Sequence, residues 1–532
     1  MSLFVTSRSY SLENAADIIK NVCLQVNRTS NKRKALFLTL GATVALVIRS
    51  VYRLFRVPRS LRHLPSVNVI PLALSILKNE DASTRARTVF ASAMKQGNGV
   101  FVVGYEQVVQ ATNQGNSFLF LVERFPKRLE VLSASHEESP SIKYFGTNSV
   151  GFVSGESWRK QRKVMNPAFR KSMPIHMFGS LTKRSFKIIE DHPGRQVPIL
   201  PYFQRVTLDA IGIAGFGFDF GAIEDMNSVW PQTYETIRHG LFSPIVLFPF
   251  LDWLLGYIFP SHWGKLNGAI DKLNGLLMDM AKQKREQLQA SVDSLTPENE
   301  KDLLTLMLEA ELRGEGSASD EELQGNLALF FFAGHDTTAN SMSFCLYNLA
   351  VHQNVQSKAR DDVLGVMGDG KEDILPTTDD LRQIPYLEMI LKETLRQFAP
   401  TPTLMPRSCK EDTDLNGIFI PKNTPIIVEL DALHNNPAVW KNPERFDPDR
   451  FAPDGENQTR FQGAAWLPFS AGHRGCIGLN FSLTQQRILL AMLLRKYTWR
   501  LPDDSIHRDG IKIGNFQNTT PASLVIEFHP RY

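Results

Sequence analysis

The residues with the clearest chemical potential lie near the C-terminus, where one cysteine stands in a glycine-rich loop. The chain there reads Phe469-Ser-Ala-Gly-His-Arg-Gly-Cys-Ile-Gly478, with Arg474 two residues before Cys476. A helical pattern begins at Leu479, so the cysteine lies close to a helix N-terminus, where the dipole and free N–H groups favour a thiolate. Such a thiolate is a suitable axial ligand for haem iron, because it donates electron density that promotes O–O cleavage. The alternative is a buried structural cysteine, but the fixed offsets of its neighbours favour the ligand.

A second candidate group lies in the segment Ala333-Gly-His-Asp336-Thr337. In a helix, Ala333, Asp336 and Thr337 fall on one face. An acid beside an alcohol supplies a hydroxyl that holds dioxygen and a carboxyl that relays protons. Gly334 costs a helix about 1 kcal/mol relative to alanine, which is explained if something must approach the backbone closely at this point. The alternative is a solvated helix face, but the six-residue apolar run before Ala333 favours burial.

A long helix must position this acid and alcohol. Ser319-Asp-Glu-Glu322 has the form of a capping box, and the apolar pattern after it continues to about Val351. An unbroken helix of that length extends about 48 Å, enough to cross a whole domain. Val100 to Gly104 predicts a strand of a small sheet. Residues 285–318, which are charged and contain Gly and Ser, predict a surface helix and loop.

Composition excludes several classes of protein. The 532 residues are 43% hydrophobic, which supports a sizeable core. The 59 basic and 55 acidic residues nearly balance, so no nucleic-acid partner is expected. The 4 cysteines are widely spaced without a CxxC pair, which argues against a disulfide framework or a structural zinc site. The bulk of the chain is therefore expected to face a reducing compartment.

The N-terminal region predicts a membrane anchor. We expect a polar tail at 1–34, an anchor helix at 35–56, a basic Pro-containing linker at 57–66 and a catalytic domain at 67–532. A cleaved signal peptide and a mitochondrial presequence are the alternatives; the long polar lead counts against the first, and Glu13 and Asp17 count against the second. The basic residues after the apolar stretch favour a cytoplasmic location for the C-terminal side.

Together these features resemble the cytochrome P450 monooxygenases over roughly residues 60–530. Four motifs follow one another in the family's order: Trp158-x-x-x-Arg162, Ala333-Gly-His-Asp-Thr-Thr338, Glu393-x-x-Arg396 and the loop around Cys476. The resemblance implies a predominantly α fold with small β-sheets (α+β), as one catalytic domain on an N-terminal anchor. It also implies haem b as cofactor, with Cys476 on the iron and Asp336 and Thr337 managing protons and oxygen.

The resemblance further implies a buried structural network of Glu393, Arg396 and a second arginine. Arg445 and Arg450 are both candidates, since each stands in a Pro-x-x-Phe element. In the family the second of two such elements carries the partner, which selects Arg450, although the letters around Arg445 match the usual pattern better.

Motif positions also assign the surroundings of the haem and the substrate. The implied cofactor contacts are Trp158, Arg162, Arg407, Phe469, Arg474, Cys476 and Gly478. The implied pocket walls are Phe331, Phe332, Ala333, Thr401, Thr403, Leu404, Phe516 and Asn518. Arg159, Lys160 and Lys163 would point away from the haem, either as a solvated face or as a docking site for a reductase. The apolar residues 241–259 resemble a loop that dips into the membrane and admits lipophilic substrates.

The expected function is the insertion of one oxygen atom of O2 into a lipophilic substrate, with electrons from NADPH through a separate flavoprotein reductase. A sterol or steroid is the first expectation for the substrate, followed by a fatty acid or an aromatic xenobiotic. The expected location is the endoplasmic reticulum membrane, with the catalytic domain in the cytoplasm. The alternatives are an oxygen-independent haem-thiolate isomerase or dehydratase and a non-catalytic haem sensor; the intact Asp336–Thr337 pair argues against the isomerase.

Overall fold

The structure is a computed structural model that describes residues 57, 59–67, 69–78, 80–96, 100–103, 107–110, 140–170, 173–225, 227–241, 260–290, 301–314, 319–405, 407–415, 417–461, 465–514 and 519–532. The chain divides into two compact units, Met1–Arg62 with Gly104–Glu106 and His63–Val103 with Gln107–Tyr532. In the first unit the described element is the 3-10 turn η1 (Arg59–Leu61). Every other described element belongs to the second unit.

The expected tail at 1–34, the anchor at 35–56 and the apolar stretch at 242–259 lie outside the described residues. Among the helices that the structure does describe, none combines the length and the apolar character needed to cross a bilayer.

The larger unit is predominantly helical, which confirms the expected fold class. Its described α-helices are α3 (Val69–Leu77), α4 (Ala82–Arg85), α5 (Ala91–Gln96), α7 (Pro140–Phe145), α8 (Gly155–Arg170), α9 (Ile175–Asp191), α10 (Ile199–Ile211), α11 (Val229–Leu241), α13 (Pro260–Ala290), α14 (Leu303–Leu312), α15 (Asp320–Val351), α16 (Gln353–Met367), α17 (Thr378–Gln383), α18 (Pro385–Gln397), α19 (Leu430–His434), α20 (Glu456–Phe461) and α21 (Leu479–Lys496).

Three small sheets accompany the helices. The first has the order β1 (Val100–Val103), β2 (Gln107–Gln110), β7 (Pro425–Val428), β4 (Arg407–Ser408); the second β3 (Gln196–Pro198), β9 (Val525–Pro530), β8 (Tyr497–Arg500); the third pairs β5 (Thr413–Leu415) with β6 (Ile418–Ile420). Strands β2 and β7 are parallel, with Val109 opposite Ile427, and the other pairs are antiparallel. The strand expected from Val100 is therefore confirmed as β1.

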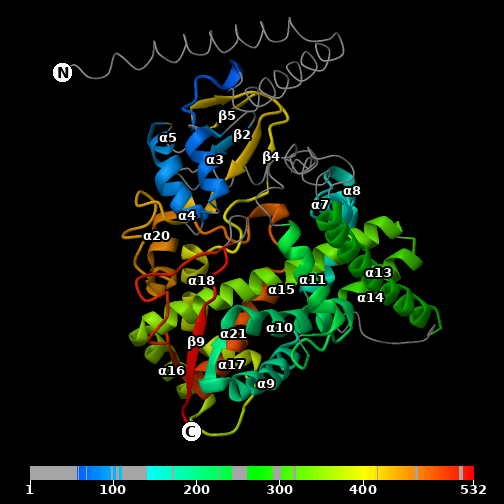
Figure 1. The fold of residues 1–532 in the computed structure, drawn as a ribbon, viewed down its shortest axis with the longest axis vertical. Coiled ribbons are helices and arrows are strands. Elements are labelled where there is room, and N and C mark those ends of the chain that lie inside the picture. The colour runs from blue at the N-terminus through cyan, green and yellow to red at the C-terminus, as the bar shows by residue number, and fades with distance from the viewer. Residues whose placement is uncertain are drawn as a thin grey trace, which may run out of the picture. The chain divides into compact units, whose positions relative to one another are not determined.

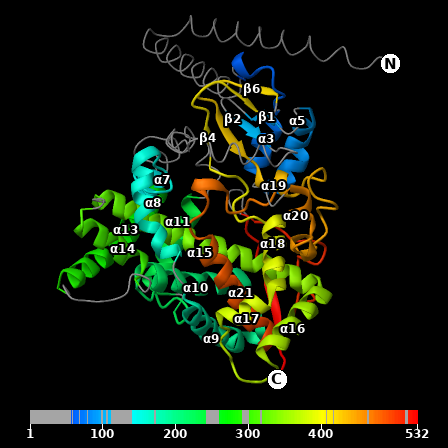
Figure 2. The ribbon, with the colours of Figure 1, turned by 180° about the vertical axis from the view of Figure 1, so that it is seen from behind.

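Helix α15 crosses the middle of this unit, with α10 and α21 beside it (Figure 1). Seen from behind, α7 lies near one end of α15 and α16 near the other (Figure 2). The side chain of Ser319 accepts a hydrogen bond from the Glu322 N–H at 3.2 Å, and the helix ends at Val351, so the predicted start and end are both confirmed. Nearly every residue from His335 to Ala350 is buried, because α10, α18, α16, α21 and the strands β8 and β9 pack against the helix.

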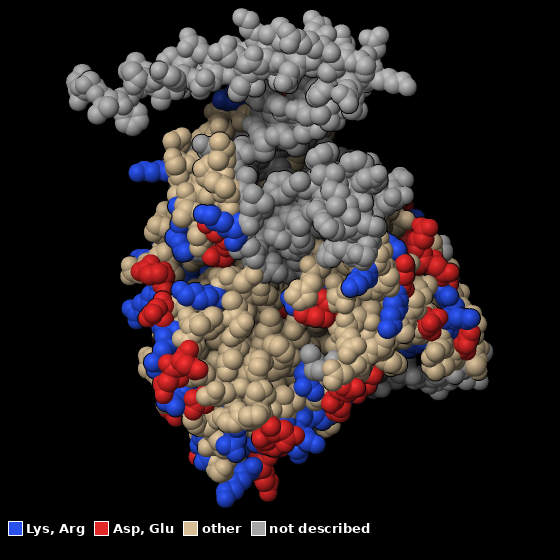
Figure 3. Space-filling view, in the orientation of Figure 1, with Lys and Arg blue, Asp and Glu red and all other residues tan. Residues whose placement is uncertain are grey.

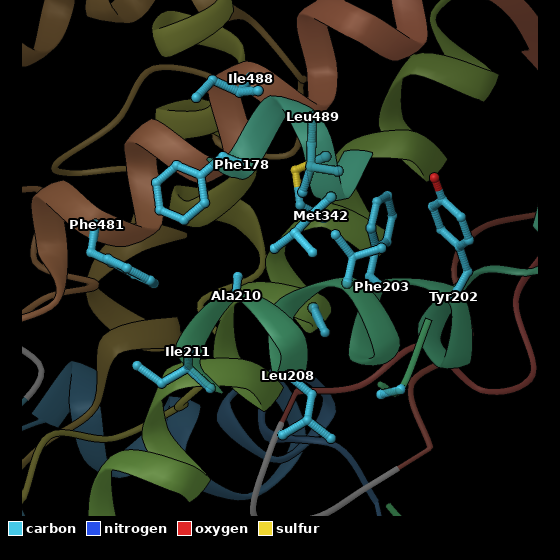
Figure 4. Packing of buried hydrophobic residues seen from close by; sticks show 14 of the residues in the cluster. Phe178, Tyr202, Phe203, Leu208, Ala210, Ile211, Met342, Phe481, Ile488 and Leu489 are labelled. Carbon is cyan, nitrogen blue, oxygen red and sulfur yellow. The ribbon is translucent and has the colours of Figure 1, made fainter. Parts of the chain in front are cut away.

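The core around α15 fixes the start of α21. Phe178 of α9 packs edge-to-face against Phe481 of α21, with ring centroids 5.0 Å apart, and Met342 of α15 and Ile211 of α10 lie in the same cluster (Figure 4). Burial of each such side chain contributes about 1.5–3 kcal/mol. The first turn of α21, which directly follows the cysteine loop, is therefore held by the core.

The expectation of a surface helix and loop over 285–318 is wrong for α14. This helix is buried from Leu303 to Leu308, because it presents five large apolar side chains within six residues. The charged residues around it pair with one another: Lys284 lies 2.5 Å from Asp302, and Lys301 lies 2.7 Å from Glu309. Charge in this stretch therefore flanks a buried helix instead of marking a solvated one.

Charges of both signs are intermixed on the face shown in Figure 3, and neither sign gathers into one large area there. This agrees with the nearly balanced charge of the chain.

One buried acid beside β7 makes stability depend on pH. Glu429 is 4% exposed, and burial together with the charge of Asp431 raises its pKa to about 8. An acid whose pKa is raised by folding binds its proton more tightly in the folded state. Its contribution to the free energy of unfolding is therefore most favourable below the unfolded pKa and is lost as the pH rises through the folded pKa. We expect the free energy of unfolding to fall by roughly 2–4 kcal/mol between about pH 5 and pH 8.

Urea unfolding of the Glu429→Gln variant at several pH values tests this expectation. The neutral amide should flatten the decline, whereas Glu411→Gln, at an exposed position, should leave it unchanged. An identical decline in wild type and Glu429→Gln would show that other groups cause it.

Candidate functional site

The cysteine loop is built by short-range backbone hydrogen bonds. The Cys476 N–H donates to the Phe469 carbonyl at 2.8 Å, and the Ser470 N–H donates to the Leu467 carbonyl at 2.9 Å. The chain turns through two left-handed conformations, with φ of 59° at Ser470 and 65° at Gly472; the glycine adopts this conformation without a Cβ clash. The loop delivers Cys476 two residues before Gly478, which caps α21.

Cys476 differs in exposure from the other cysteines that the structure describes. Cys345 and Cys409 are buried, and burial raises the pKa of their thiols to about 12 and about 11. Cys476 is exposed, although the fold encloses the helix that follows it. Of these three thiols, Cys476 is the one that an external group can reach.

Three arginines gather beside the loop, from three separate segments of the chain. Arg474 lies over the ring of Trp158 in α8, with its guanidinium carbon 4.2 Å from the ring centroid. Arg162, one turn further along α8, donates to the Gly475 carbonyl at 2.9 Å. Arg407, at the start of β4, is 2% exposed. Three of the expected cofactor contacts, all arginines, are thus brought together around the cysteine loop.

The electrostatics of these arginines call for an anion. Burial, and after it the positive charges of Arg407 and Arg162, lower the pKa of Arg474 to about 10. Burial also lowers the pKa of Arg407 to about 10. Nη1 of Arg474 is buried and makes no hydrogen bond with the residues that the structure describes. The two carboxylates of haem b would satisfy this donor and offset the repulsion, so the residues fit that cofactor.

On α15, the predicted acid and alcohol point in different directions. The Thr337 hydroxyl is half-buried and donates to the Ala333 carbonyl at 3.0 Å, and Ala333 itself is exposed. Asp336 is 2% exposed, and its carboxylate accepts hydrogen bonds from Gln204 of α10 at 2.8 Å and from the hydroxyl of Tyr234 in α11 at 2.6 Å. Thr337 therefore faces an open surface, whereas Asp336 is held between two neighbouring helices.

Tyr234 keeps its proton in this arrangement. Burial, and then the negative charge of Asp336, raise its pKa well above the usual range. The hydroxyl therefore keeps its hydrogen and donates it to Asp336. A cavity of about 620 Å³ is lined by Tyr234, Gln204 and His335, and the first two of these lining residues donate hydrogen bonds to Asp336. Neither Thr337 nor Cys476 lines it, so it is distinct from the surface in front of the alcohol.

The glycine at position 334 of α15 allows the neighbouring helix α10 to pack closely against it. A Cβ at this position would lie 2.5 Å from Cγ1 of Ile211 in α10. The helix therefore needs glycine here to pack against α10, not only to admit a ligand as the sequence suggested. This packing also determines the distance from Gln204 to Asp336, since Gln204 is on the same helix as Ile211.

The expected pocket walls divide into two groups. Ala333 is exposed, and Phe332 is half-buried with its ring 5.4 Å from that of Phe145. Phe331 is fully buried, with its ring 5.4 Å from Phe220 and 5.5 Å from Tyr234, so it packs within the core on the α11 side of the helix. The reason is helical geometry: Phe331 shares a face with His335, about 100° away from Phe332.

The remaining residues that were expected to line the pocket come after α18 in the chain. Thr401 is half-buried, Thr403 is exposed, and Leu404 is 8% exposed, with its N–H donating to the Val428 carbonyl at 2.9 Å. Phe516 and Asn518 lie outside the described residues.

The centre of a charged network, the pair of Glu393 and Arg396, is fully buried. Glu393 and Arg396, one turn apart on α18, pair through two hydrogen bonds of 2.7 and 2.9 Å. Nε of Arg450 lies 3.3 Å from Glu393, and its guanidinium also pairs with Glu456. Arg445 is exposed. Of the two candidate arginines, Arg450 is the one that lies against Glu393.

Comparison with known proteins agrees with this architecture. A family model described as "Cytochrome P450" matches residues 123–524. The chain belongs to the cytochrome P450 family. Cytochrome P450 3A5 of Homo sapiens is 28% identical over 370 residues, 67% of this chain and 70% of that protein. Cytochrome P450 4F5 of Rattus norvegicus is 30% identical over 371 residues, 66% of this chain and 68% of that protein.

Solved structures of the family share the fold. The crystal structure of the cytochrome P450DA heme domain superposes with a TM-score of 0.72 and 23% identity, covering 88% of this chain and 98% of that one. Family membership makes this P450 a haem-thiolate monooxygenase with haem b as its cofactor. Haem held by a thiolate supplies the oxygen chemistry, and the chain supplies binding, orientation and proton supply.

Sequence patterns alone did not single out Gln204, Tyr234 or His434. Gln204 and Tyr234 are far from Asp336 in sequence, and nothing in their local segments marks them as its partners. His434 lies in Asp-Ala-Leu-His-Asn-Asn, which belongs to none of the four motifs. Only contacts between distant segments identify these three residues.

Proposed function

We propose that this P450 hydroxylates a lipophilic substrate, with Cys476 as the ligand of haem iron and with electrons from NADPH through a separate flavoprotein reductase. The observation that carries this proposal is the exposed thiol of Cys476 beside Arg474, whose buried Nη1 has no hydrogen-bond partner among the described residues and whose pKa is lowered by the charges of Arg407 and Arg162. The arginines Arg162, Arg407 and Arg474 would hold the haem propionates, and Trp158 keeps Arg474 in place by stacking.

Asp336 and Thr337 would supply protons on the α15 side of the haem. Because the Thr337 hydroxyl donates its hydrogen to Ala333, its oxygen lone pairs are available to order a water molecule in front of the helix. The Asp336 carboxylate would exchange protons with the cavity beside Tyr234 and Gln204, and it must turn away from these partners to deliver a proton toward Thr337.

The reductase would dock on the basic face of α8. Arg159, Lys160 and Lys163 are exposed on this helix, while Trp158 and Arg162 of the same helix face the cysteine loop. Lys160 pairs with Glu156 at 3.4 Å, an exposed contact that costs little to break on docking. An acidic partner would thus approach the enzyme from the side of its cysteine.

We propose the endoplasmic reticulum membrane as the location, with residues 35–56 as the anchor, 57–66 as the linker, 67–532 as the catalytic domain in the cytoplasm and 241–259 as a second membrane contact. The uncharged run in the anchor supports this proposal. Carbonate extraction of membranes that contain the full chain tests it, and release of the protein by carbonate would refute the anchor.

A sterol or steroid is the proposed substrate, followed by a fatty acid or an aromatic xenobiotic, because the pocket segments are apolar. Reconstitution of the purified holoenzyme with NADPH, reductase and a panel of such compounds tests the function. Each compound is first titrated for a spin-state change in the Soret band, and those that bind are assayed for oxygen uptake and hydroxylated product. Product formation without NADPH and oxygen would instead favour an isomerase or dehydratase.

The role of Thr337 gives a sharper prediction. Thr337→Val keeps the shape of the side chain but removes the oxygen atom that orders water. NADPH and oxygen consumption should continue, but product per NADPH should fall about tenfold or more, with the electrons released as hydrogen peroxide, because positioned proton transfer contributes about 10²–10⁴-fold. The measurement is the ratio of product and peroxide to NADPH oxidised.

Ser343→Ala is the matched control, because Ser343 also donates its hydroxyl to a carbonyl one turn back on α15, at 2.8 Å, but is fully buried. The ratio of product to NADPH oxidised, here called the coupling, should be unchanged in this control. Equal coupling in Thr337→Val and wild type would remove the proposed role of the alcohol.

A further inference from the structure

His434 connects two parts of the site that are far apart in sequence. It ends α19 and is fully buried. Its backbone carbonyl accepts a hydrogen bond from Nη1 of Arg396 at 2.7 Å, and its ring Nε2 lies 3.1 Å from the backbone N–H of Leu467. The same residue therefore contacts the buried Glu393–Arg396 pair and the start of the cysteine loop.

The contact with Leu467 defines the state of the ring. A backbone N–H can only donate, so Nε2 must be unprotonated and the hydrogen must be on Nδ1. Burial, and then the charge of Arg396, lower the pKa of His434 to about 3, which keeps the ring neutral. Nδ1 is buried and has no hydrogen-bond partner among the described residues. A histidine at this position thus leaves one buried donor unsatisfied, while its other nitrogen accepts the loop N–H.

From Leu467 a short series of hydrogen bonds leads to the thiol-bearing residue. The Leu467 carbonyl accepts the Ser470 N–H at 2.9 Å, and the neighbouring Phe469 carbonyl accepts the Cys476 N–H at 2.8 Å. Trp466 adds a second attachment to α18, since its indole N–H donates to the Lys392 carbonyl at 2.9 Å. The start of the loop is therefore tied to α18 at one residue and to α19 at the next.

We propose that His434 is a positioning residue for the haem thiolate: its neutral ring fixes the start of the cysteine loop to the buried charge network. This inference rests on the proposed role of Cys476. When Leu467 is fixed, the turn through Ser470 is fixed too, and with it the Phe469 carbonyl that orients the backbone of Cys476. Loss of the acceptor would leave the loop able to shift and weaken the bond between the cysteine and the cofactor.

The test compares holoenzymes carrying His434→Leu and His434→Gln. Leucine fills a similar volume but accepts no hydrogen bond, whereas the glutamine Oε1 can occupy the position of Nε2. For His434→Leu we expect haem to dissociate about tenfold faster, because the Leu467 N–H is left buried without an acceptor. We also expect most of its reduced carbon-monoxide complex to lose the red-shifted Soret band that reports thiolate ligation. His434→Gln should restore both measurements toward wild type.

His507→Leu is the matched control. His507 is 1% exposed, and its ring also accepts a backbone N–H, that of Lys512 at 3.0 Å, but in the C-terminal segment and not beside the cysteine loop. This control should lower the unfolding temperature without changing the Soret band of the protein that remains folded. A merely structural histidine at 434 would behave in the same way.

A second variant keeps the inference testable if His434→Leu yields no folded protein. Trp466→Phe removes the other attachment and leaves the His434 bond in place, so it should speed haem loss by a smaller factor than tenfold while retaining most of the red-shifted band. Retention of the full band and of the wild-type haem dissociation rate in His434→Leu would overturn the inference, and if that variant does not fold, the same retention in Trp466→Phe would overturn it. Absence of the band from wild type would instead contradict the role of Cys476.

Discussion

Replacement of Cys476 by Ser or Ala is expected to abolish the red-shifted Soret band of the reduced carbon-monoxide complex. Neither a hydroxyl nor a methyl group can supply the electron donation of a thiolate to haem iron. Hydroxylation should be lost with the band, because O–O cleavage depends on the same donation. The measurement is a difference spectrum of the purified variant at matched protein concentration, with haem content determined separately so that loss of cofactor and loss of ligation are told apart.

Cys345→Ala and Cys409→Ala are the controls. Both thiols are buried, so these variants can lose some stability, but they should keep the band. A Cys476→Ala protein that retained the band would refute the assignment of the ligand, and loss of the band only in one of the controls would move the assignment to that cysteine.

Neutralisation of Glu393 is expected to have the largest effect on stability. Its carboxylate accepts two hydrogen bonds from Arg396, lies 3.3 Å from Arg450 and accepts the Asp447 N–H at 3.0 Å. Glu393→Gln keeps the shape but leaves buried positive charge without its counter-ion, which costs about 3–5 kcal/mol. Since whole proteins are stable by about 5–15 kcal/mol, we expect little folded holoenzyme. Urea unfolding and haem content of the soluble fraction measure this effect.

Alanine variants of the two tandem arginines, Arg450 and Arg445, should differ in stability and haem content in the same assay. Arg450→Ala removes a buried partner of Glu393 and Glu456, so it should lose stability and haem to a degree comparable with Glu393→Gln. Arg445→Ala changes an exposed side chain and should stay within about 0.5 kcal/mol of wild type. The reverse result, with haem lost from Arg445→Ala alone, would show that the arginine at 445 serves the network.

The sequence by itself determined the features that depend on neighbouring residues. Helix α15 begins after Ser319 and ends at Val351 as the capping residue and the apolar pattern predicted, because caps and periodicity act within one or two turns. The glycine-rich loop before α21 was equally clear, since left-handed conformations such as that of Gly472 favour glycine locally. The motifs at these positions were sufficient to indicate the family, which the comparisons confirm.

Only the tertiary structure decided which side chains face one another. Asp336 and Thr337 are adjacent in sequence, yet α10 and α11 hold the acid while the alcohol faces an open surface. Phe331 and Phe332 are also adjacent, and only the second is accessible, because α11 covers the face of the first. Adjacent residues on a helix differ in direction by about 100°, so their roles depend on which helix covers each face.

The same reason explains the partners that the sequence left undecided. Local spacing pairs Glu393 with Arg396 but cannot choose between Arg445 and Arg450, since both follow similar Pro-containing turns; burial of one and exposure of the other separates them. His434 was not identified because its contact with Leu467 spans 33 residues of chain. The pattern of a sequence specifies conformation over a few residues, whereas hydrogen-bond partners across the core are set by packing of whole elements, which no local pattern contains.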